Sequence, residues 1–471
     1  RPFALGTVGT YETLNYLREA PYMGQLLDIL AVKYLIYPYP DTRRQNLDAE
    51  KIDYYHTFLD QLSNLPWVDS VTNFGTEMEP IPLIKTKNNQ DHFFVAPATW
   101  IVLGSDSIYR ELVFLPQFDL SKNAFLFLEE KSKLGENIDS LPFSKVILYG
   151  KDNLDLAVSF FGQSNFIFPA KDLDFSPNPS ASSGQAGWWK RETSDLVWWR
   201  DFLQQKYGID NSDFDYGGGW AVGEGSLKLE VRSLKFKEGN LLLARVMKSS
   251  RGGKVSFYQG DKLVGEIDTK IEKPEKVKIK LSGYKEIPDR FFKYDKTNFQ
   301  WFEVGRLATN QHALTIKTEG DINVVNALVT VSEGKFITTQ NRINELIHQS
   351  RVIYWDKLSN FEKQNLFSQK TSNIKVSYER KTPTLYKVKV EGLNSPVTLV
   401  FSETYDSLWE IRRSGQKIGS SYTLYSLVNG FKIEKDGTYE IYFSPQKYVI
   451  SGLIISAVTL IFLVIFLKRS R

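Results

Sequence analysis

The sequence predicts a multidomain protein that combines a small α/β layer, two β-sandwiches and one C-terminal transmembrane helix. Three short apolar runs, at residues 100–104, 124–128 and 145–149, alternate with segments that could be helices, which indicates a parallel α/β layer. Two later regions consist of β-runs broken by Gly, Asp and Lys turns, which is typical of sandwiches. Residues 448–467 carry no charge and are almost wholly apolar.

The composition supports buried cores and excludes some classes of function. A chain of 471 residues suggests two to four domains, and 42% hydrophobic with 14% aromatic residues is ample for their cores. The net charge of +4 is small against 59 basic and 55 acidic residues, so we expect no nucleic-acid partner. The chain has no Cys, which excludes disulfides and thiolate metal sites; with no Asn-x-Ser/Thr acceptor, this fits a bacterial or archaeal exterior.

The apolar stretch at 448–467 reads YVISGLIISAVTLIFLVIFL and would reach about 30 Å as a helix, the thickness of a hydrocarbon core. Lys468, Arg469 and Arg471 follow it, whereas Lys447 alone lies close before it, so the positive-inside rule predicts a cytoplasmic tail and an extracytoplasmic bulk. The chain opens at Arg1 without a targeting pattern, so we expect a missing upstream membrane region or a processed protein.

The domain organisation follows from these patterns in chain order. The first segment shows helical spacing around Phe58 and Leu62 and one strand candidate at 32–37. A stretch at 169–187, rich in Pro, Ser, Ala and Gly, indicates a linker. The predicted units are a mainly helical segment (1–80), the α/β domain with its linker (81–187), an aromatic and Gly-rich segment (188–225), a jelly-roll-like sandwich (226–334), a helical connector (335–372), an Ig-like membrane-proximal sandwich (373–447), the transmembrane helix (448–467) and a basic tail (468–471).

No recognised enzyme signature occurs in the chain, and we predict no catalytic residue. The sequence contains no HExxH, no GxxxxGK[ST], no GxSxG and no Gly-rich dinucleotide fingerprint. Its four histidines, His56, His92, His312 and His348, are scattered without metal-ligand spacing, so structural roles are favoured.

The densest unusual segment is WWKRETSDLVWWRDFLQQKYGIDNSDFDYGGGW, residues 188–220. Aromatic faces stack on sugar rings while carboxylates accept from sugar hydroxyls, and the glycines at 217–219 would allow close approach of the backbone. An alternative is that half of these aromatics pack into the core, because 196–203 places apolar residues on one helical face. The carbohydrate-binding candidates are Trp188, Trp189, Asp213, Asp215, Tyr216 and Trp220.

A metal site in the same segment has weaker support. Asp213 and Asp215 form a DxD pair, as metal-binding transferases carry, but Asp172 and Asp174 form another such pair. Asp210 could join them as ligands of a structural Ca²⁺, although the Gly spacing does not match an EF-hand loop. We expect no other cofactor in this region.

Four motifs lie at the two ends of the chain: LLDILAVKYLI (26–36), FSETYDSLWEI (401–411), YSLVNGF (425–431) and the final strand and helix in YFSPQKYVISGLIIS. Together they resemble the C-terminal extracytoplasmic part of YfhO-like, GT-C-type polytopic membrane glycosyltransferases. The central sandwich, with FQWFEVGRLATNQHALTIKTEG, is similar to jelly-roll carbohydrate-binding modules.

The resemblance implies transfer of a sugar from a polyprenyl-phosphate donor, with this chain as an accessory region for glycan or acceptor recognition. GT-C enzymes carry their catalytic acid in the first extracytoplasmic loop between membrane helices, which the resemblance would place before Arg1, so no catalytic residue is carried over. The implied partners are the bilayer, a glycan or lipid-linked sugar, and an upstream membrane region of the same protein. Two alternatives stay open, a single-anchor carbohydrate-binding or adhesive surface protein and a glycoside hydrolase with two carboxylates.

Overall fold

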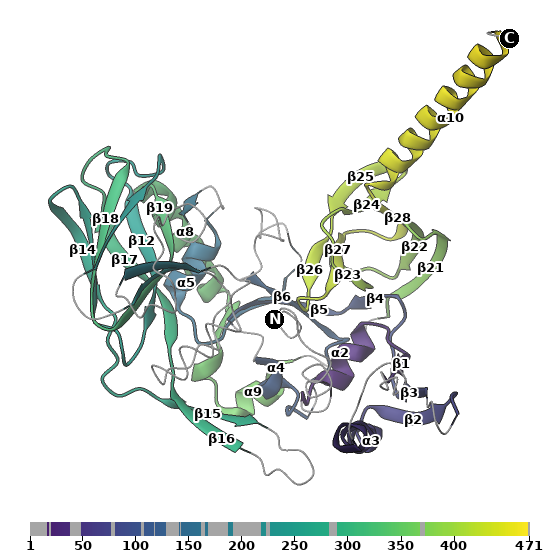
Figure 1. Cartoon of the computed structure of the whole chain (residues 1–471), viewed down its shortest axis with the longest axis horizontal. Helices are drawn as coiled ribbons and strands as arrows, with labels where there is room; N and C mark the ends of the chain where they lie inside the picture. Colours follow the sequence, from purple (N-terminus) through teal and green to yellow (C-terminus); the bar gives the residue numbers. More distant parts are fainter. Residues whose placement is uncertain are drawn as a thin grey trace.

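The computed structural model consists mainly of β-sheets, with few helices and one long C-terminal helix (Figure 1). The predicted fold class is confirmed, since sandwich-like sheets dominate, a small α/β region lies between them, and the C-terminal helix is apolar. The residues that the structure describes are 17, 20–37, 49–76, 81–104, 108–116, 118–128, 141, 143–161, 165–167, 187–191, 218–222, 227–281, 290–367 and 373–469.

The N-terminal part packs one amphipathic helix, α3, on a small antiparallel sheet. Helix α3 buries Phe58 and Leu62 against this sheet, as their helical spacing predicts. Strand β1 matches the predicted strand candidate. Strand β2 was not predicted, because it buries only its first residue and therefore shows no apolar alternation. The elements are α2 (Met23–Ile29), β1 (Tyr34–Ile36), α3 (Ala49–Ser63), β2 (Val68–Asn73) and β3 (Pro82–Thr86), with sheet order β1-β3-β2.

A four-stranded parallel sheet joins the two halves of the chain. Its first three strands are the predicted apolar runs, and all five residues of β6 are buried, as expected for a parallel strand covered on both faces. The fourth strand, β20, lies inside the segment for which the sequence predicts a helical connector, and three residues are too short a run to signal a strand. The order is β6 (Asn123–Phe127), β5 (Ala98–Leu103), β7 (Lys145–Leu148) and β20 (Val352–Tyr354), with α4 (Ile108–Leu112), α5 (Asn153–Ser159), α8 (Glu333–His348) and α9 (Asn360–Leu366) around it.

The central sandwich packs a six-stranded sheet on a four-stranded sheet around a core that includes Leu242, Val325, Phe257 and Ile316. Two strands of the aromatic segment, β9 and β10, are part of its larger sheet. The larger sheet has the order β17 (Asn298–Arg306), β12 (Leu241–Lys248), β19 (Ile322–Val331), β10 (Gly218–Val222) and β9 (Gly187–Arg191), with β8 (Phe166–Ile167) paired to β19. The smaller sheet has the order β11 (Leu227–Arg232), β18 (Ala313–Glu319), β13 (Lys254–Gln259) and β14 (Lys262–Asp268).

One predicted strand of this region lies outside the sandwich. The run KVKIKLSG forms β15 (Lys276–Leu281), which pairs with β16 (Arg290–Asp295) as a separate two-stranded ribbon. In Figure 1 this ribbon extends from the end of the central sandwich, away from the C-terminal helix.

The C-terminal sandwich takes one strand from the N-terminal half of the chain. Strand β4 pairs with β23 although about 300 residues separate them in sequence, so this sandwich is not one continuous stretch. Phe93 and Phe401, which are paired in one sheet, stack at a centroid distance of 4.5 Å, and the ring of Trp409 from the other sheet lies 5.0 Å from that of Phe401 in the shared core. The sheets are β21 (Lys375–Thr382), β22 (Leu385–Glu391), β28 (Gly437–Phe443), β24 (Trp409–Arg413) and β25 (Gln416–Ser420), and β26 (Tyr422–Leu424), β27 (Val428–Ile433), β23 (Val397–Thr404) and β4 (Phe93–Ala96).

Buried Tyr425 links the C-terminal sandwich to the parallel sheet by hydrogen bonds. Its backbone N–H donates to the carbonyl of Phe125 at 2.7 Å, and its hydroxyl donates to the carbonyl of Leu120 at 2.8 Å. One apolar cluster runs without a break from α2 through the parallel sheet to β26 and β27. The two units therefore share a core.

Helix α10 (Gln446–Arg469) follows β28 after two residues and projects from the body (Figure 1). It is long and apolar enough to cross a membrane, and the apolar part is exposed throughout. At about 1.5 Å per residue, 24 residues span roughly 36 Å. Among the described residues it is the one helix with these properties.

Candidate functional site

Strands β9 and β10 place two of the predicted sugar-stacking residues directly opposite each other. In the antiparallel register Trp220 pairs with Trp189, while Trp188 pairs with Ala221. Directly opposed residues of an antiparallel pair share one face of a sheet, and their Cβ atoms lie about 5 Å apart. Trp189 and Trp220 therefore share one face, and Trp188 belongs to the other.

The register with β19 shows which face this is. Trp220 pairs with Val324, and Gly219 pairs with Val325. Val325 belongs to the core between the two sheets of the sandwich, and neighbouring residues of a strand alternate between faces. Val324, Trp220 and Trp189 are therefore placed on the outer face of the larger sheet.

The position of the tryptophan pair suits contact with a ligand. Strand β9 is the terminal strand of the larger sheet in the described part of the chain, so the pair lies at an edge. Tryptophan combines an apolar ring with an N–H donor, the combination that recognises the C–H faces and hydroxyls of sugars, so two tryptophan positions on one face make this edge a candidate site.

The remaining sequence candidates are not brought to this face by any described backbone. Trp188 is placed on the inner face by its register with Ala221, which pairs in turn with Asn323. Asp210, Asp213, Asp215 and Tyr216 lie outside the described residues.

A buried polar group that the sequence did not indicate lies on the same outer face. Arg245 of β12 donates from Nη1 to the Asn326 side-chain oxygen at 2.8 Å, and its guanidinium lies 5.2 Å from the ring centre of Phe299. Asp155 of α5 is also buried; desolvation raises the pKa of its carboxyl to about 6, against the opposing effect of Lys151 and Arg245. Asp155 and Arg245 are therefore buried where α5 packs on this sheet.

The parallel sheet offers a second place where ligands commonly bind, the carboxyl edge at the point where strand order reverses. The order β6-β5-β7-β20 puts this point between β5 and β7. There Glu111 of α4 accepts hydrogen bonds from Trp355 Nε1 at 2.7 Å, the Tyr149 hydroxyl at 2.9 Å and Lys363 Nζ at 3.2 Å.

The Glu111 cluster is a closed hydrogen-bonded network. Burial alone would raise the pKa of Glu111, but hydrogen bonds from Trp355, Tyr149 and Lys363 outweigh burial and lower this pKa. The Lys363 ammonium also lies 4.6 Å from the centre of the Trp355 ring. Because these polar groups satisfy one another, we assign the cluster to holding α9 against the sheet.

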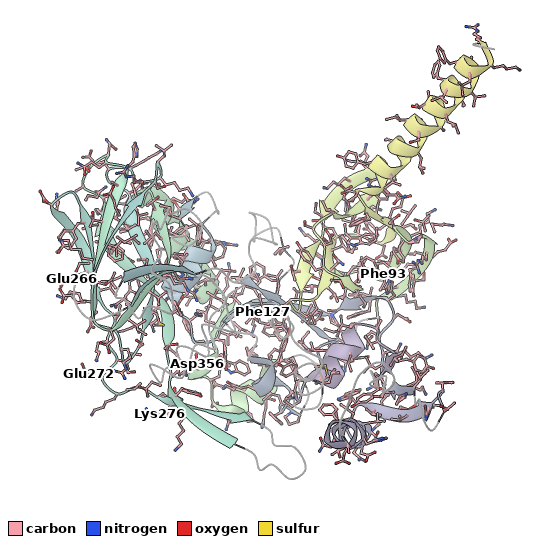
Figure 2. All side chains as sticks on the ribbon, in the orientation of Figure 1. Phe93, Phe127, Glu266, Glu272, Lys276 and Asp356 are labelled. Carbon is pink, nitrogen blue, oxygen red and sulfur yellow. The ribbon has the colours of Figure 1, made fainter. Side chains whose placement is uncertain are left out.

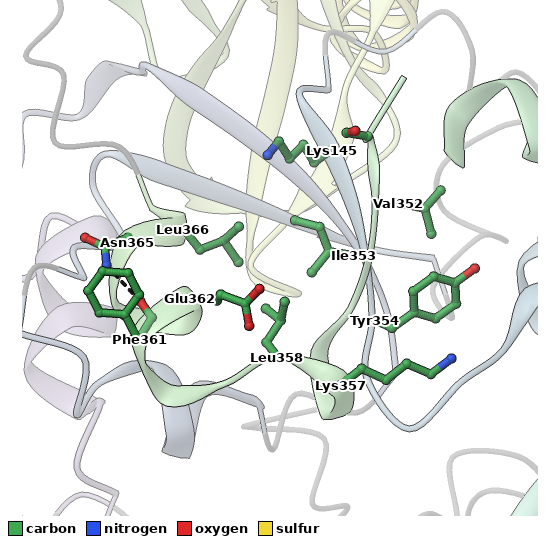
Figure 3. Close-up of a pocket in the computed structure, with 11 residues that line it drawn as sticks. Lys145, Val352, Ile353, Tyr354, Lys357, Leu358, Phe361, Glu362, Asn365 and Leu366 are labelled. Carbon is green, nitrogen blue, oxygen red and sulfur yellow. Dashed lines mark hydrogen bonds between the residues drawn. The ribbon is translucent and has the colours of Figure 1, made fainter. Parts of the chain in front are cut away.

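A surface groove of about 500 Å³ lies between β20 and α9 (Figure 3). Ile353, Leu358 and Leu366 provide apolar lining, with Lys145 and Lys357 also at its border. Glu362 caps α9 by accepting from the Ser359 N–H at 2.8 Å and its hydroxyl at 2.7 Å, and the Asn365 amide donates to the Phe361 carbonyl at 2.8 Å. Two of the polar lining residues are thus used within α9.

Among the described residues, no three His, Asp or Glu side chains are grouped as metal ligands. His92 instead packs beside aromatic rings, with centroids 5.1 Å from Phe401 and 5.5 Å from Tyr386, and its Nε2 lies 3.4 Å from Glu403 Oε1.

No protein-family model matches the chain, and no curated protein matches its sequence. Solved structures that align with parts of it include a mutant of the arabinofuranosyltransferase AftD from Mycobacteria, at 10% identity and a TM-score of 0.18 over 49% of this chain and 14% of that one. The unmutated AftD aligns at 9% identity and a TM-score of 0.17 over 51% and 22%. A carbohydrate-binding module of Cellvibrio mixtus lichenase 5A, solved with cellotriose, aligns at 17% identity and a TM-score of 0.14 over 26% and 86%. The chain thus spans only a small part of the transferase, 14% to 22% of its length in these two alignments.

Proposed function

We propose that this chain is the extracytoplasmic accessory region of an integral-membrane glycosyltransferase, of the GT-C type and similar to the YfhO-like group, and that it recognises a glycan acceptor. The observation that carries the proposal is the register that places Trp189 opposite Trp220 on the outer face of a β-sandwich. Tryptophans at the edge of a sheet are suited to stack on sugar rings.

The position of the anchor supports this role. Ser444 and Pro445 alone separate β28 from α10, so the C-terminal sandwich stands close to the headgroups of any membrane that α10 crosses. A recognition domain held there would meet a lipid-linked donor at high effective concentration. We further propose that Lys468 and Arg469 face the cytoplasm, following the positive-inside rule, and that the catalytic residues belong to an upstream membrane region.

Glycan binding by the detergent-solubilised chain tests the proposal. We expect signal on a glycan array, and we expect Trp220→Ala and Trp189→Ala each to weaken binding by roughly five- to 150-fold, if stacking of a sugar on one aromatic contributes as much as stacking of a nucleobase, about 1–3 kcal/mol. Trp188→Ala is the matched control, because it removes an indole from the same strand on the opposite face. Its signal should persist in protein whose melting temperature shows that it is folded.

Two results would contradict the proposal. The absence of binding to any glycan would remove the recognition role. Equal loss of binding in all three variants, with folded protein, would show that the face shared by Trp189 and Trp220 is not the binding site.

A single-anchor surface protein with the same binding edge is the second candidate, favoured by the one membrane-length helix among the described residues. The upstream gene sequence separates the two, because the first requires many apolar spans and the second one signal peptide.

A further inference from the structure

The β15–β16 ribbon has one basic and one apolar face. Its antiparallel register pairs Lys276 with Asp295, Lys278 with Lys293 and Lys280 with Phe291. The alternate pairs are Val277 with Tyr294, Ile279 with Phe292 and Leu281 with Arg290. Because opposed residues share a face and neighbours alternate, four lysines are placed on one face and the aliphatic residues on the other.

The base of the basic face is neutralised and ordered. Lys276 forms an ion pair with Asp295, which also accepts from the Ser250 hydroxyl at 2.7 Å. Burial would raise the pKa of Asp295, but the hydrogen bonds from Lys276 and Ser250 lower it overall. Next to this pair, Lys296 lies 2.9 Å from Glu275. These contacts attach the ribbon to the sandwich, at the end where Figure 2 shows Lys276.

Beyond the base, the register places two lysines at directly opposed positions. Lys278 lies directly opposite Lys293, and Lys293 is exposed. Like charges at directly opposed positions destabilise a strand pair. A bound anion would remove this repulsion, so the ribbon is favoured as a binding surface for negative charge.

The spacing of the charges selects the form of the anion. Lys276 is already paired with Asp295. Beyond it, Lys278 and Lys280 follow one another at about 7 Å along β15, twice the rise per residue, and Lys293 lies opposite Lys278. A linear polymer with repeated negative groups can place one group at each of these positions. The basic row therefore fits a polyanion that runs along the strand.

We propose that the β15–β16 ribbon binds an anionic segment of a polysaccharide that carries repeated carboxylate or phosphate groups. This inference rests on the proposed glycan-recognition function and specifies the charge class of the glycan. Strand β16 leads directly into β17, which is the end strand of the same sheet that carries Trp189 at its other end. One long glycan could therefore contact both surfaces of the central sandwich.

Two other polyanionic occupants fit the observations less well. In Figure 1 the ribbon extends on the side of the body away from α10, so it does not face the headgroups of the membrane that α10 would enter. The chain leads from β16 directly into β17 of the sheet that carries the tryptophan pair, which favours a sugar polymer over a nucleic acid. Lysines also protect exposed strand edges against aggregation, and that role alone requires no ligand.

The test measures binding of the full chain in detergent to polygalacturonate, to a polyol-phosphate polymer and to neutral dextran. The double variant Lys278→Gln/Lys293→Gln should bind the preferred polyanion roughly tenfold more weakly. Its affinity should also depend less steeply on salt concentration, because a surface with fewer lysines releases fewer counterions from the polyanion on binding. Lys278→Arg/Lys293→Arg should retain binding. Lys387→Gln/Lys389→Gln, which removes two exposed lysines from β22, is the matched control and should also retain it.

The outcomes separate this inference from the function on which it rests. Unchanged polyanion binding by the Gln variant would overturn the inference and leave edge protection as the role of the lysines. Binding of neutral glycans alone, still sensitive to Trp220→Ala, would overturn the inference and preserve the proposed function. No glycan binding of any kind would overturn both. Ribbon-dependent binding to phosphatidylglycerol vesicles or to single-stranded DNA, stronger than to either polymer, would overturn the assignment to a polysaccharide.

Discussion

The Ser402 hydroxyl donates a buried hydrogen bond of 2.8 Å to the carbonyl of Ile29, joining residues that are 373 positions apart. Ile29 ends α2, and Ser402 lies in β23. The Ser402 N–H donates in turn to the carbonyl of His92 at 3.0 Å. The two motifs at opposite ends of the chain, at 26–36 and 401–411, are therefore in direct contact.

Ser402→Ala should destabilise this contact by about 1–3 kcal/mol, because it leaves the Ile29 carbonyl buried without that donor. The melting temperature of the purified chain checks this. Ser407→Ala, at an exposed position of the same motif, is the control and should change little. If both variants melt alike, the hydrogen bond contributes nothing measurable.

Glu111→Gln should loosen α9 from the parallel sheet. All three neighbours of this carboxylate are donors, so the amide of Gln presents an N–H where an acceptor is needed, at a cost of about 1–3 kcal/mol. Hydrogen exchange of the α9 amides should accelerate, whereas exposed Glu272→Gln should leave it unchanged. Unaltered exchange in Glu111→Gln would refute the assigned role.

The same carboxylate predicts a pH dependence. Because the folded-state pKa of Glu111 is lowered from 4.5, its contribution to stability is complete above about pH 4.5 and is lost as the pH falls through the folded pKa. The free energy of unfolding of Glu111→Gln should lack this decrease at acid pH.

His92 should cause a second loss of folding stability, at a higher pH than the loss that protonation of Glu111 causes. Burial lowers the pKa of this imidazole, with Glu403 raising it and Arg380 lowering it further. The unfolded chain therefore binds the proton first as the pH falls through about 6.5, so the folded state loses stability below that pH. His92→Gln should remove this part of the pH dependence. Denaturation at a series of pH values tests the sign, and parallel curves for both proteins would contradict it.

Val458→Asp should weaken retention of the chain in membranes, because an acidic residue near the centre of a spanning helix costs about 3 kcal/mol. Val458 lies within α10 and is 45% exposed in the isolated chain. Extraction of membranes without detergent should release more of this variant, while Val458→Leu stays bound. Release of the unmutated chain under the same conditions would show that α10 does not anchor it.

The elements that the sequence predicted are those with a strong local pattern. An uncharged apolar run identified α10, helical spacing of Phe58 and Leu62 identified α3, and apolar runs identified β5, β6 and β7. Each of these patterns repeats within a few neighbouring residues, so no distant contact is needed to recognise it.

The tryptophan site was predicted in part. Its composition singled out Trp188, Trp189 and Trp220, but composition does not show which residues of β9 and β10 are paired. A slip of one residue between β9 and β10 would move a strand's side chains to the opposite face, so only pairing could show that Trp189 rather than Trp188 accompanies Trp220.

By itself, the sequence determined the membrane-length helix, the β-rich class and the aromatic candidates, because periodicity and apolarity are local properties. The tertiary structure decided that β4 and β20 complete sheets far from them in the chain, that β15 leaves the sandwich, and that two tryptophans share one face. Strands this short gain their stability from partners distant in sequence, and the pairing of those partners is what places each side chain.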